Sequence, residues 1–385
     1  MSSHKPSIAR NVSSSGKRSI KSDKKKPTEV YNRYLFPMTI TNMYNGIKYI
    51  ITGLQRVEKF GGIYIVTDKN TNALKSIKFG LADNYHVEID VYVTCMELFP
   101  DTNKINKIID YGIIEGRDEP FILMENMALN LGEYLKTFEN NRFDSLTGFT
   151  VLLECLKCIS FFHSIGFVHR NIKPSSFYIE LNDNKSINRM FICDFEGAQR
   201  VNLEPSKLGN MSNSLKEIYE RRLKEKTCGL KYCPIRQHNP CKPIFKDDIE
   251  SWFYMGLFFL EGTLPWVKCS NHDEMKVEKA KQKMRDPGNN FYKHAPIRFT
   301  TLINHIDNFE ESEPINYDFL IDKMEKYIKF LQEEDKNKFE LSKDKYIMEA
   351  EKYRKNGSVE KGKMKNNGEG KGEQAKCEKK KKAMI

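Results

Sequence analysis

The sequence predicts an α+β protein whose first part is a small antiparallel sheet with one helix and whose second part is larger and mainly helical. Short apolar runs separated by turn residues follow one another between residues 49 and 124, a pattern typical of a strand meander. Beyond residue 126 the apolar residues recur at helical spacing instead. The change of period places the boundary between the two parts near residue 126.

Strand-like segments dominate the first part. Runs of β-branched and aromatic residues alternate with polar turn residues such as Asp68–Asn72, which favour reversals between antiparallel strands. Val87 and Val91, and then Met96, indicate a helix after the third strand. The predicted strands are Tyr49–Ile51, Ile63–Val66, Ala73–Phe79, Ile113–Ile114 and Phe121–Met124.

Helices dominate the second part. Leu156, Ile159 and Phe162 recur at helical spacing in the longest of them, so one face of that helix is expected to be buried. A helix that begins at Asp248 stops at Gly262, a typical helix end. The predicted helices are Leu131–Phe138, Ser145–Ile165, Asp248–Gly262 and Tyr317–Glu333.

The two ends of the chain differ in composition from the middle. Residues 1–33 are rich in Ser and Lys, and residues 336–385 are rich in Lys, Glu, Gly and Asn. Neither segment can bury enough apolar surface to offset the entropy of ordering it. We therefore expect flexible basic tails, solvated or in contact with acidic surfaces, around one folded region at 34–335 with lobes at 34–126 and 127–335.

The composition places the chain among globular proteins. It has 385 residues, 39% of them hydrophobic, and a formal net charge of +11. Its nine scattered cysteines fit reduced thiols better than a disulfide framework. The longest apolar run, near Phe253–Leu260, is too short to cross a bilayer. We expect a cytoplasmic or nuclear protein with no membrane span and no specific nucleic-acid partner.

One cluster of potential metal ligands comprises Cys228, Cys233, His238 and Cys241. It lacks the paired Cys-x-x-Cys spacing that gives a zinc prediction its strength. A zinc site is therefore not favoured there.

The most informative segment is residues 167–177, which read Phe-Val-His-Arg-Asn-Ile-Lys-Pro-Ser-Ser-Phe and are followed by Asp194-Phe195-Glu196. The catalytic loop of protein kinases reads His-Arg-Asp and closes on Asn, and their metal loop reads Asp-Phe-Gly. The chain resembles this pair of motifs with three changes. Asn171 stands at the general base, Ser176 at the amide metal ligand and Glu196 at the glycine.

Further segments resemble the casein kinase 1 superfamily and, within it, the tau-tubulin kinases. The resemblance covers about residues 49–327 and implies a bilobal protein-kinase fold that binds ATP and Mg²⁺ and acts on protein substrates or partners. The segments that carry it are Phe60–Tyr64, His169–Phe177, Lys246–Met255, Glu261–Trp266 and Asn316–Ile321.

The resemblance also implies which residues bind the nucleotide. Lys78 is implied to contact the ATP phosphates, with Asp90 as its helix partner and Glu88 as a rival partner. Gly61 is the glycine that remains in the phosphate-covering loop. The other implied contacts are Met124 at the gatekeeper position, Glu125 and Met127 in the hinge, Ser176, and Tyr178 beneath the adenine.

The changes fall on the reactive positions. Asn171 cannot accept the substrate proton, and loss of a positioned base typically costs about 10² to 10⁴ in rate. Ser176 is a weaker metal ligand than an amide oxygen, which leaves Asp194 as the principal magnesium carboxylate. Lys173 can still balance charge on the transferred phosphate. Glu196 adds negative charge beside the metal, where it either repels phosphate or replaces a ligand.

The phosphate-covering loop has lost two glycines. Alignment of Phe60–Gly61 with the end of that loop places Arg56 and Glu58 at the first two glycine positions. A carboxylate about 4 Å from a phosphate charge repels it by roughly 1 to 4 kcal/mol. Because Tyr178 also narrows the adenine pocket, weak or absent ATP binding is expected.

Some retained residues are expected to serve architecture. His169 and Phe195 are typical packing residues, and Asp248 is expected to cap its helix or hold a loop backbone. Lys78 on a cleft wall is expected to keep its ammonium group in water. Loss of Asp248 is therefore expected to destabilise the protein more than loss of Lys78.

These observations favour a pseudokinase that acts as a protein-binding scaffold or regulator. One alternative is an active Ser/Thr protein kinase that transfers the γ-phosphate of ATP, with Glu196 or a water molecule taking over the lost chemistry. Another is a switch that binds ATP without catalysis.

Overall fold

The computed structural model describes residues 35–336, apart from 58–61, 69–70, 81, 128, 185, 202–211, 224, 270–272, 287–290 and 311–313. The predictions for the two tails, for Gly61 and for Glu58 concern residues outside these ranges. The chain divides into two compact units, one rich in strands and one helical.

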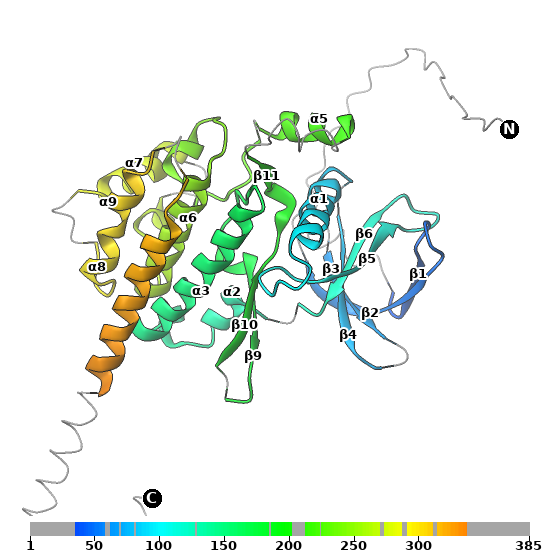
Figure 1. Ribbon diagram of the computed structural model, residues 1–385, viewed down its shortest axis with the longest axis horizontal. Coiled ribbons are helices and arrows are strands. Elements are labelled where there is room, and N and C mark those ends of the chain that lie inside the picture. The colour runs from blue at the N-terminus through cyan, green and yellow to red at the C-terminus, as the bar shows by residue number, and fades with distance from the viewer. Residues whose placement is uncertain are drawn as a thin grey trace, which may run out of the picture. The chain divides into compact units, whose positions relative to one another are not determined.

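The first unit contains residues up to Asn130 together with 165–170 and 176–227. Its main feature is a six-stranded antiparallel sheet with the order β1-β2-β3-β4-β6-β5 (Figure 1). The edge strand β1 was not predicted, because it is short and only Ile40 of it is buried. The strands are β1 (Met38–Thr41), β2 (Lys48–Val57), β3 (Gly62–Thr67), β4 (Leu74–Phe79), β5 (Ile108–Ile113) and β6 (Pro120–Glu125).

An apolar core fixes the register of this sheet. Tyr64, Ile77, Phe79 and Phe121, from three adjacent strands, belong to one buried cluster, and the rings of Tyr64 and Phe79 lie 4.9 Å apart. Successive side chains of a strand point to opposite faces. Lys78, between Ile77 and Phe79, must therefore point to the other face of the sheet.

Helix α1 (Ala82–Leu98) packs on the sheet, where it contacts strand β6 (Figure 1). Val87 and Val91 are fully buried, as their spacing predicted. Met96 is 51% exposed, and Cys95 is buried in its place. The buried face of α1 therefore continues at Cys95, four residues after Val91, and not at Met96, five residues after it, because residues four apart lie on the same face of a helix.

Two small sheets and helix α5 complete the first unit. Three of the strands in these sheets have only two residues, which is too short to show a period, and the two longer strands were not predicted either. Helix α5 (Asn213–Arg222) begins at Ser212, whose side chain accepts a hydrogen bond from the Leu215 N–H. The three-stranded sheet contains β7 (Leu129–Asn130), β9 (Phe177–Leu181) and β10 (Ile187–Ile192), and the two-stranded sheet pairs β8 (Phe167–Val168) with β11 (Gln199–Arg200).

The second unit contains residues 131–164, 171–175 and those from Cys228 onward. At its centre α3 (Ser145–Ser164) packs against α6 (Phe245–Glu261), and the Trp252 indole N–H donates to the Leu152 carbonyl at 3.0 Å. The other helices are α2 (Leu131–Leu135), α7 (Glu274–Met284), α8 (Ile297–Thr300), α9 (Leu302–Asp307) and a helix at 317–336. The 3₁₀ turns in the described part of the chain are η4 (Phe195–Gly197), which belongs to the first unit, and η2 (Glu139–Asn141), η3 (Pro174–Ser176), η5 (Ile235–His238) and η6 (Pro265–Lys268).

Helix α3 is long and apolar enough to cross a membrane by length and composition alone. The expectation that no segment would reach this length is therefore corrected. Much of the helix is buried in the second unit, including Leu152, Leu156, Ile159 and Phe162. A core helix of a globular protein passes the same test, so this is weak evidence for a span.

The start of α6 corrects one of the two roles expected for Asp248, that of the helix cap. The helix is capped by Asp247, whose carboxylate accepts the Ile244 N–H at 2.9 Å. Asp248 lies one position on and is fully buried, with its Oδ2 2.9 Å from Nε2 of His163. The other nitrogen of His163 meets the Tyr317 hydroxyl. This carboxylate therefore ties α6 to α3 through a side chain.

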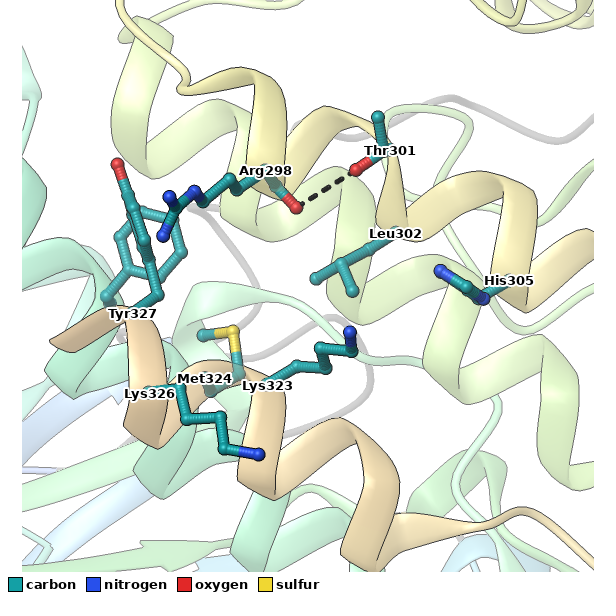
Figure 2. A pocket seen from close by; sticks show the side chains of 9 residues that line it. Arg298, Thr301, Leu302, His305, Lys323, Met324, Lys326 and Tyr327 are labelled. Atoms are coloured by element: carbon teal, nitrogen blue, oxygen red, sulfur yellow. Dashed lines mark hydrogen bonds between the residues drawn. The ribbon is translucent and has the colours of Figure 1, made fainter. Parts of the chain in front are cut away.

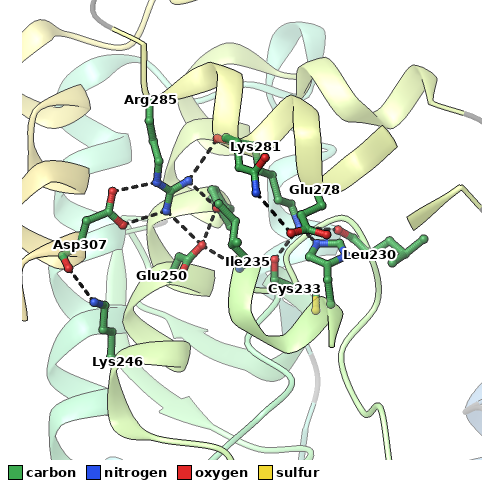
Figure 3. A network of polar contacts seen from close by, with 12 residues as sticks. Leu230, Cys233, Ile235, Lys246, Glu250, Glu278, Lys281, Arg285 and Asp307 are labelled. Atoms are coloured by element: carbon green, nitrogen blue, oxygen red, sulfur yellow. Dashed lines mark hydrogen bonds and ion pairs between the residues drawn. The ribbon is translucent and has the colours of Figure 1, made fainter. Parts of the chain in front are cut away.

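A polar network joins α6, α7 and α9 within the second unit (Figure 3). The buried Glu250 accepts hydrogen bonds from the Ile235 N–H at 2.9 Å and from Arg285 at 3.1 Å. Arg285 also reaches Asp307 at 2.7 Å. The ammonium group of Lys281, which is fully buried, donates to the Leu230 carbonyl at 2.8 Å. Burial of these charges is tolerated because each is hydrogen-bonded.

We predict that Gly256→Ala lowers the free energy of unfolding by about 1 to 3 kcal/mol, because a methyl group at this position of α6 would meet Phe299. A Cβ there would lie 2.5 Å from the Phe299 ring and 3.0 Å from Leu152. Urea denaturation of the full chain measures the change. Gly229→Ala, where a Cβ meets nothing within 4 Å, is the matched control and should not destabilise. Equal stability of the two variants would contradict the close packing.

Candidate functional site

The candidate site is centred on Lys78 of β4. Its ammonium group pairs with Glu88 of α1 and lies 2.8 Å from Oε1 of Glu196 in η4. Lys78 is 9% exposed, so the expectation that this ammonium group stays in water is wrong. The second oxygen of Glu196 accepts a hydrogen bond from Asn84 at 3.3 Å. Both oxygens of Glu196 are therefore used inside the first unit.

The helix partner of Lys78 is Glu88, and the assignment of Asp90 to this role is corrected. Side chains two positions apart on an α-helix point in roughly opposite directions, because each residue turns the helix by about 100°. Asp90 instead makes a bidentate ion pair with Arg200, both distances being 2.6 Å. It also accepts a hydrogen bond from the Tyr219 hydroxyl of α5 at 2.7 Å.

The charges around Lys78 are unbalanced. Burial acts to lower the pKa of Lys78, but the carboxylates of Glu88, Glu196 and Asp194 overcome it and hold this pKa well above its usual range. Burial raises the pKa of Glu88 to about 7, although the charge of Lys78 opposes the shift. Three acidic groups thus act on this one cation, and the pKa of one of them, Glu88, is raised.

There is little free space next to this cluster. The cavity lined by Lys78, Asn84, Glu88 and Glu196 has a volume of about 10 Å³, which is the space of about one water molecule. The carboxylate of Glu196 thus fills the space beside the ammonium group.

The hinge predicted from the sequence makes a closed ring of hydrogen bonds with neighbouring strands. The Met127 N–H donates to the Ser76 hydroxyl at 2.9 Å, which in turn donates to Oε1 of Gln55 at 2.9 Å. The amide nitrogen of Gln55 then donates to the Met127 carbonyl at 2.6 Å. The backbone donor and acceptor of Met127 are both taken by side chains of β2 and β4.

The other hinge positions are occupied in a similar way. The Glu125 carbonyl accepts from the Asn106 amide at 2.9 Å, and its N–H donates to the Lys107 carbonyl at 3.0 Å. Met124 is 1% exposed, with the Tyr92 hydroxyl 3.9 Å from its sulfur. Adenine presents an amino donor and ring-nitrogen acceptors. The Met127 N–H is already used, and the Glu125 and Met127 carbonyls each already accept one hydrogen bond.

Tyr178, expected as the floor of the adenine pocket, is in contact with β2. Its ring is buried and stacks on Phe191 with centroids 5.8 Å apart. Arg56 of β2 hydrogen-bonds its hydroxyl, and the guanidinium carbon lies 5.3 Å from the ring centroid. Arg56, the residue predicted at a lost glycine, therefore contacts Tyr178, the residue predicted beneath the adenine.

The expected metal and catalytic residues are divided between the units. Ser176 is fully buried in the first unit, and its carbonyl accepts the Cys193 N–H at 2.9 Å. Asp194 has a left-handed backbone with φ 72°, a conformation that is uncommon for residues other than glycine. Asn171 and Lys173 are half-buried in the second unit. Within the described ranges, no group of three or more His, Cys, Asp or Glu side chains is arranged to hold a metal ion.

Two motif residues serve packing around Asp194. Phe195 is fully buried, with its ring 5.3 Å from that of Tyr92 and 5.8 Å from that of His169. Nε2 of His169 lies 2.9 Å from the Cys193 carbonyl. Arg222 of α5 donates to the Glu196 carbonyl. The backbone that carries Glu196 is thus fixed on both sides.

Sequence reasoning missed Gln55, Ser76, Asn106 and Asn84. Ser76 lies within a predicted strand and Asn84 near the predicted helix, whereas Gln55 and Asn106 lie outside the predicted elements, and polar side chains are usually solvated. Of these four residues, Ser76 offered a usable signal. It lies between Lys75 and Ile77 in a predicted strand that is central in the sheet, and its side chain is 0% exposed. A polar side chain at such a position must find a partner inside the protein.

The fold and the motifs define a kinase-like protein. The solved structure of vaccinia related kinase 3 resembles this chain with a TM-score of 0.63, covering 79% of this chain and 94% of that one at 16% sequence identity. This likeness confirms the predicted bilobal α+β protein-kinase fold. No protein-family model matches the chain.

Two curated relatives carry the names of serine/threonine kinases. The chain is 24% identical over 266 residues to the serine/threonine-protein kinase spe-6 of Caenorhabditis elegans, a match that covers 67% of this chain and 66% of the relative. It is 28% identical over 203 residues to a probable serine/threonine-protein kinase of Dictyostelium discoideum, covering 53% of this chain and 38% of the relative. These matches support the protein-kinase resemblance at the level of sequence.

We predict that Lys78→Met lowers the free energy of unfolding by about 3 to 5 kcal/mol, because it leaves the buried Glu88 and the half-buried Glu196 without their cation. This loss should exceed that of Asp248→Ala, about 1 to 3 kcal/mol, which reverses the order expected from the sequence. Urea denaturation measures both. The control is Lys75→Met on the same strand, where the pair with Asp68 is partly exposed and contributes at most about 1 kcal/mol. Similar losses for Lys75→Met and Lys78→Met would contradict a buried cluster.

A second prediction concerns pH. The pKa of Glu88 is raised from 4.5 to about 7 in the folded protein, so the folded state binds this proton more tightly than the unfolded state. The contribution of Glu88 to stability is therefore largest below about pH 4.5 and falls as the pH rises to about 7. Urea denaturation between these values should show that Glu88→Gln removes this decline. Glu97→Gln, exposed on the same helix, should behave as wild type. A Glu88→Gln profile parallel to wild type would disprove the assignment.

Proposed function

We propose that this chain is a pseudokinase of the casein kinase 1 and tau-tubulin kinase group, which acts as a protein-binding scaffold or regulator. The observation that carries the proposal is the 2.8 Å ion pair between Lys78 and Glu196. Glu196 stands where the kinase metal loop has glycine. Its carboxylate takes the position on the lysine that a phosphate would need.

Electrostatics oppose a triphosphate at this lysine. A bound nucleotide would have to displace Glu196, yet the displaced carboxylate would remain close to the phosphates. Like charges about 4 Å apart repel by roughly 1 to 4 kcal/mol at the effective dielectrics of water and protein surfaces. Asp194 and Glu88 add to the same negative potential. The site therefore favours a cation far more than an anion.

The hydrogen bonds of the hinge also oppose nucleotide binding. Adenine would have to break the hydrogen-bond ring of Gln55, Ser76 and Met127, and each broken bond leaves a polar group to be satisfied again. An unsatisfied buried donor or acceptor costs about 1 to 3 kcal/mol. Arg56 and Tyr178 must also separate before a base can enter. Weak or absent binding of ATP and Mg²⁺ follows.

The catalytic loop adds an independent loss. Asn171 has no basic group at neutral pH, so it cannot take the proton of a substrate hydroxyl. Lys173 and Asp194 remain, and they are the residues that favour the alternative of an active Ser/Thr kinase, as do the names of the relatives. A switch that holds ATP without transferring phosphate is the third possibility. A partner-binding role needs neither nucleotide nor base.

We predict that the purified chain transfers phosphate at least about 10²-fold more slowly than an active kinase assayed beside it. Single-turnover reactions with γ-labelled ATP, with casein and myelin basic protein as acceptors, measure this. Asn171→Asp alone should not restore transfer, because Lys78 stays engaged with Glu196. Transfer by wild type at ordinary kinase rates would establish the active-kinase alternative.

Binding of Mg-ATP is measured in parallel by thermal shift. Wild type should show little stabilisation, whereas the combined variant Gln55→Leu, Ser76→Ala and Glu196→Gly should gain nucleotide affinity by about tenfold or more, since about 1.4 kcal/mol is enough for that change. Thr52→Ala, on an exposed position of β2, is the control. Tight magnesium-dependent binding by wild type would favour the switch.

A further inference from the structure

A pocket of about 350 Å³ lies in the second unit, between α8 and α9 on one side and the helix at 317–336 on the other. Figure 2 shows the side chain of Arg298 extending to the ring of Tyr327, and that of Leu302 facing Met324 and Lys323. A volume of this size falls in the range of ligand-binding pockets, about 300 to 1,000 Å³. We call it the Arg298 pocket.

The Arg298 pocket has an apolar base and basic walls. Phe149, Leu302 and Met324 are buried and supply the base. The remaining lining residues are mostly cationic or polar, and no carboxylate is among the residues that line the pocket. The basic residues are Arg298, Lys323, Lys326 and His305.

The cations are held in place by aromatic rings. The guanidinium carbon of Arg298 lies 4.7 Å from the Phe330 ring and 5.7 Å from that of Tyr327, and the Lys323 ammonium group lies 5.3 Å from the Phe319 ring. Stacking of a guanidinium on a ring face leaves its N–H edges free to meet a carboxylate. The aromatic contacts thus hold the cationic groups of Arg298 and Lys323 in place without neutralising their charge.

Lys326 differs because it has an acidic neighbour. It lies 2.8 Å from Asp322 on the same helix, with both side chains more than half exposed. An exposed pair of this kind contributes little. A ligand carboxylate can therefore share Lys326 at small cost.

Apolar surface continues past the mouth of the pocket. Phe330 is 37% exposed, stacks on Tyr327 with centroids 5.9 Å apart and lies against Arg298. A ligand that fills the base and also covers this ring must be extended. A peptide with one bulky apolar residue flanked by acidic residues meets both requirements.

We propose that the Arg298 pocket binds an acidic segment of a protein partner, with a bulky apolar side chain inserted over Leu302 and Met324 and with carboxylates on Arg298 and Lys323. Charge argues against the other occupants. The segments outside the described ranges carry lysine runs such as Lys24–Lys26 and Lys379–Lys382, and a second copy of the chain brings a formal net charge of +11. The inference goes beyond the proposed function, because it names the chemistry of a partner and does not depend on the nucleotide site.

The test uses the full chain and fluorescence anisotropy of a labelled peptide, Asp-Glu-Asp-Leu-Trp-Glu-Asp-Glu. Wild type should bind it with an affinity that falls as salt rises from about 0.05 to 0.5 M, because surface charges are screened. Arg298→Glu with Lys323→Glu should weaken binding by about tenfold or more. Lys329→Glu is the matched control, since this residue is exposed on the same helix but does not line the pocket. It should bind within about twofold of wild type.

Three results would overturn the proposal. They are equal binding of a peptide with Lys in place of its acids, equal binding of one with Ala in place of Leu-Trp, and no loss in the charge-reversed variant. Displacement by dodecanoate without any binding of the peptide would also overturn it and would assign the pocket to small amphipathic acids.

Two controls keep the test decisive. Should the double variant fail to fold in a thermal melt, the milder Lys323→Ser takes its place with the same expected direction. Phosphotransfer is assayed on the same samples, so that failure of peptide binding and failure of the proposed function are read separately.

Discussion

The first unit depends on how one buried ammonium group is neutralised. Lys78 sits on the face of the sheet opposite the apolar core, and burial there is tolerated only because carboxylates from α1 and η4 meet it. These contacts fix the position of α1 and the backbone after Asp194 together. The Asp90 cluster with Arg200 and Tyr219 holds the other side of α1. A helix that in a kinase-like fold is free to shift is here tied at two points.

The hydrogen bonds around Met127 are complete without a ligand. Gln55, Ser76 and Met127 form a closed ring in which each member is satisfied by another. Bonds arranged in such a ring polarise one another, and a fully satisfied buried network is rigid. This ring therefore needs no ligand to complete its hydrogen bonds.

Much of the fold could be predicted, because strand and helix periods are local properties of the sequence. The motifs around His169 and Phe195 were equally visible, and the fold class is confirmed by the structural likeness. The sequence alone could not decide the partner of Lys78. Glu88 and Asp90 point about 200° apart around α1, so the choice between them depends on how the helix is rotated relative to the sheet. The role of Glu196 was left open between repulsion and ligation. Neither alternative included an ion pair with Lys78, which needs the three-dimensional approach of η4 to β4.

Tethering gives the pair of Lys78 and Glu196 a property that a bound nucleotide lacks. Groups held in one folded chain meet at effective concentrations of millimolar or above, and Glu196 is further fixed through Asn84 and Arg222. A free anion must compete with a rival that never diffuses away. Under the proposed function, ordinary swings in cellular nucleotide level leave this molecule unchanged, so that its shape carries no information about energy status and stays constant for a docking partner.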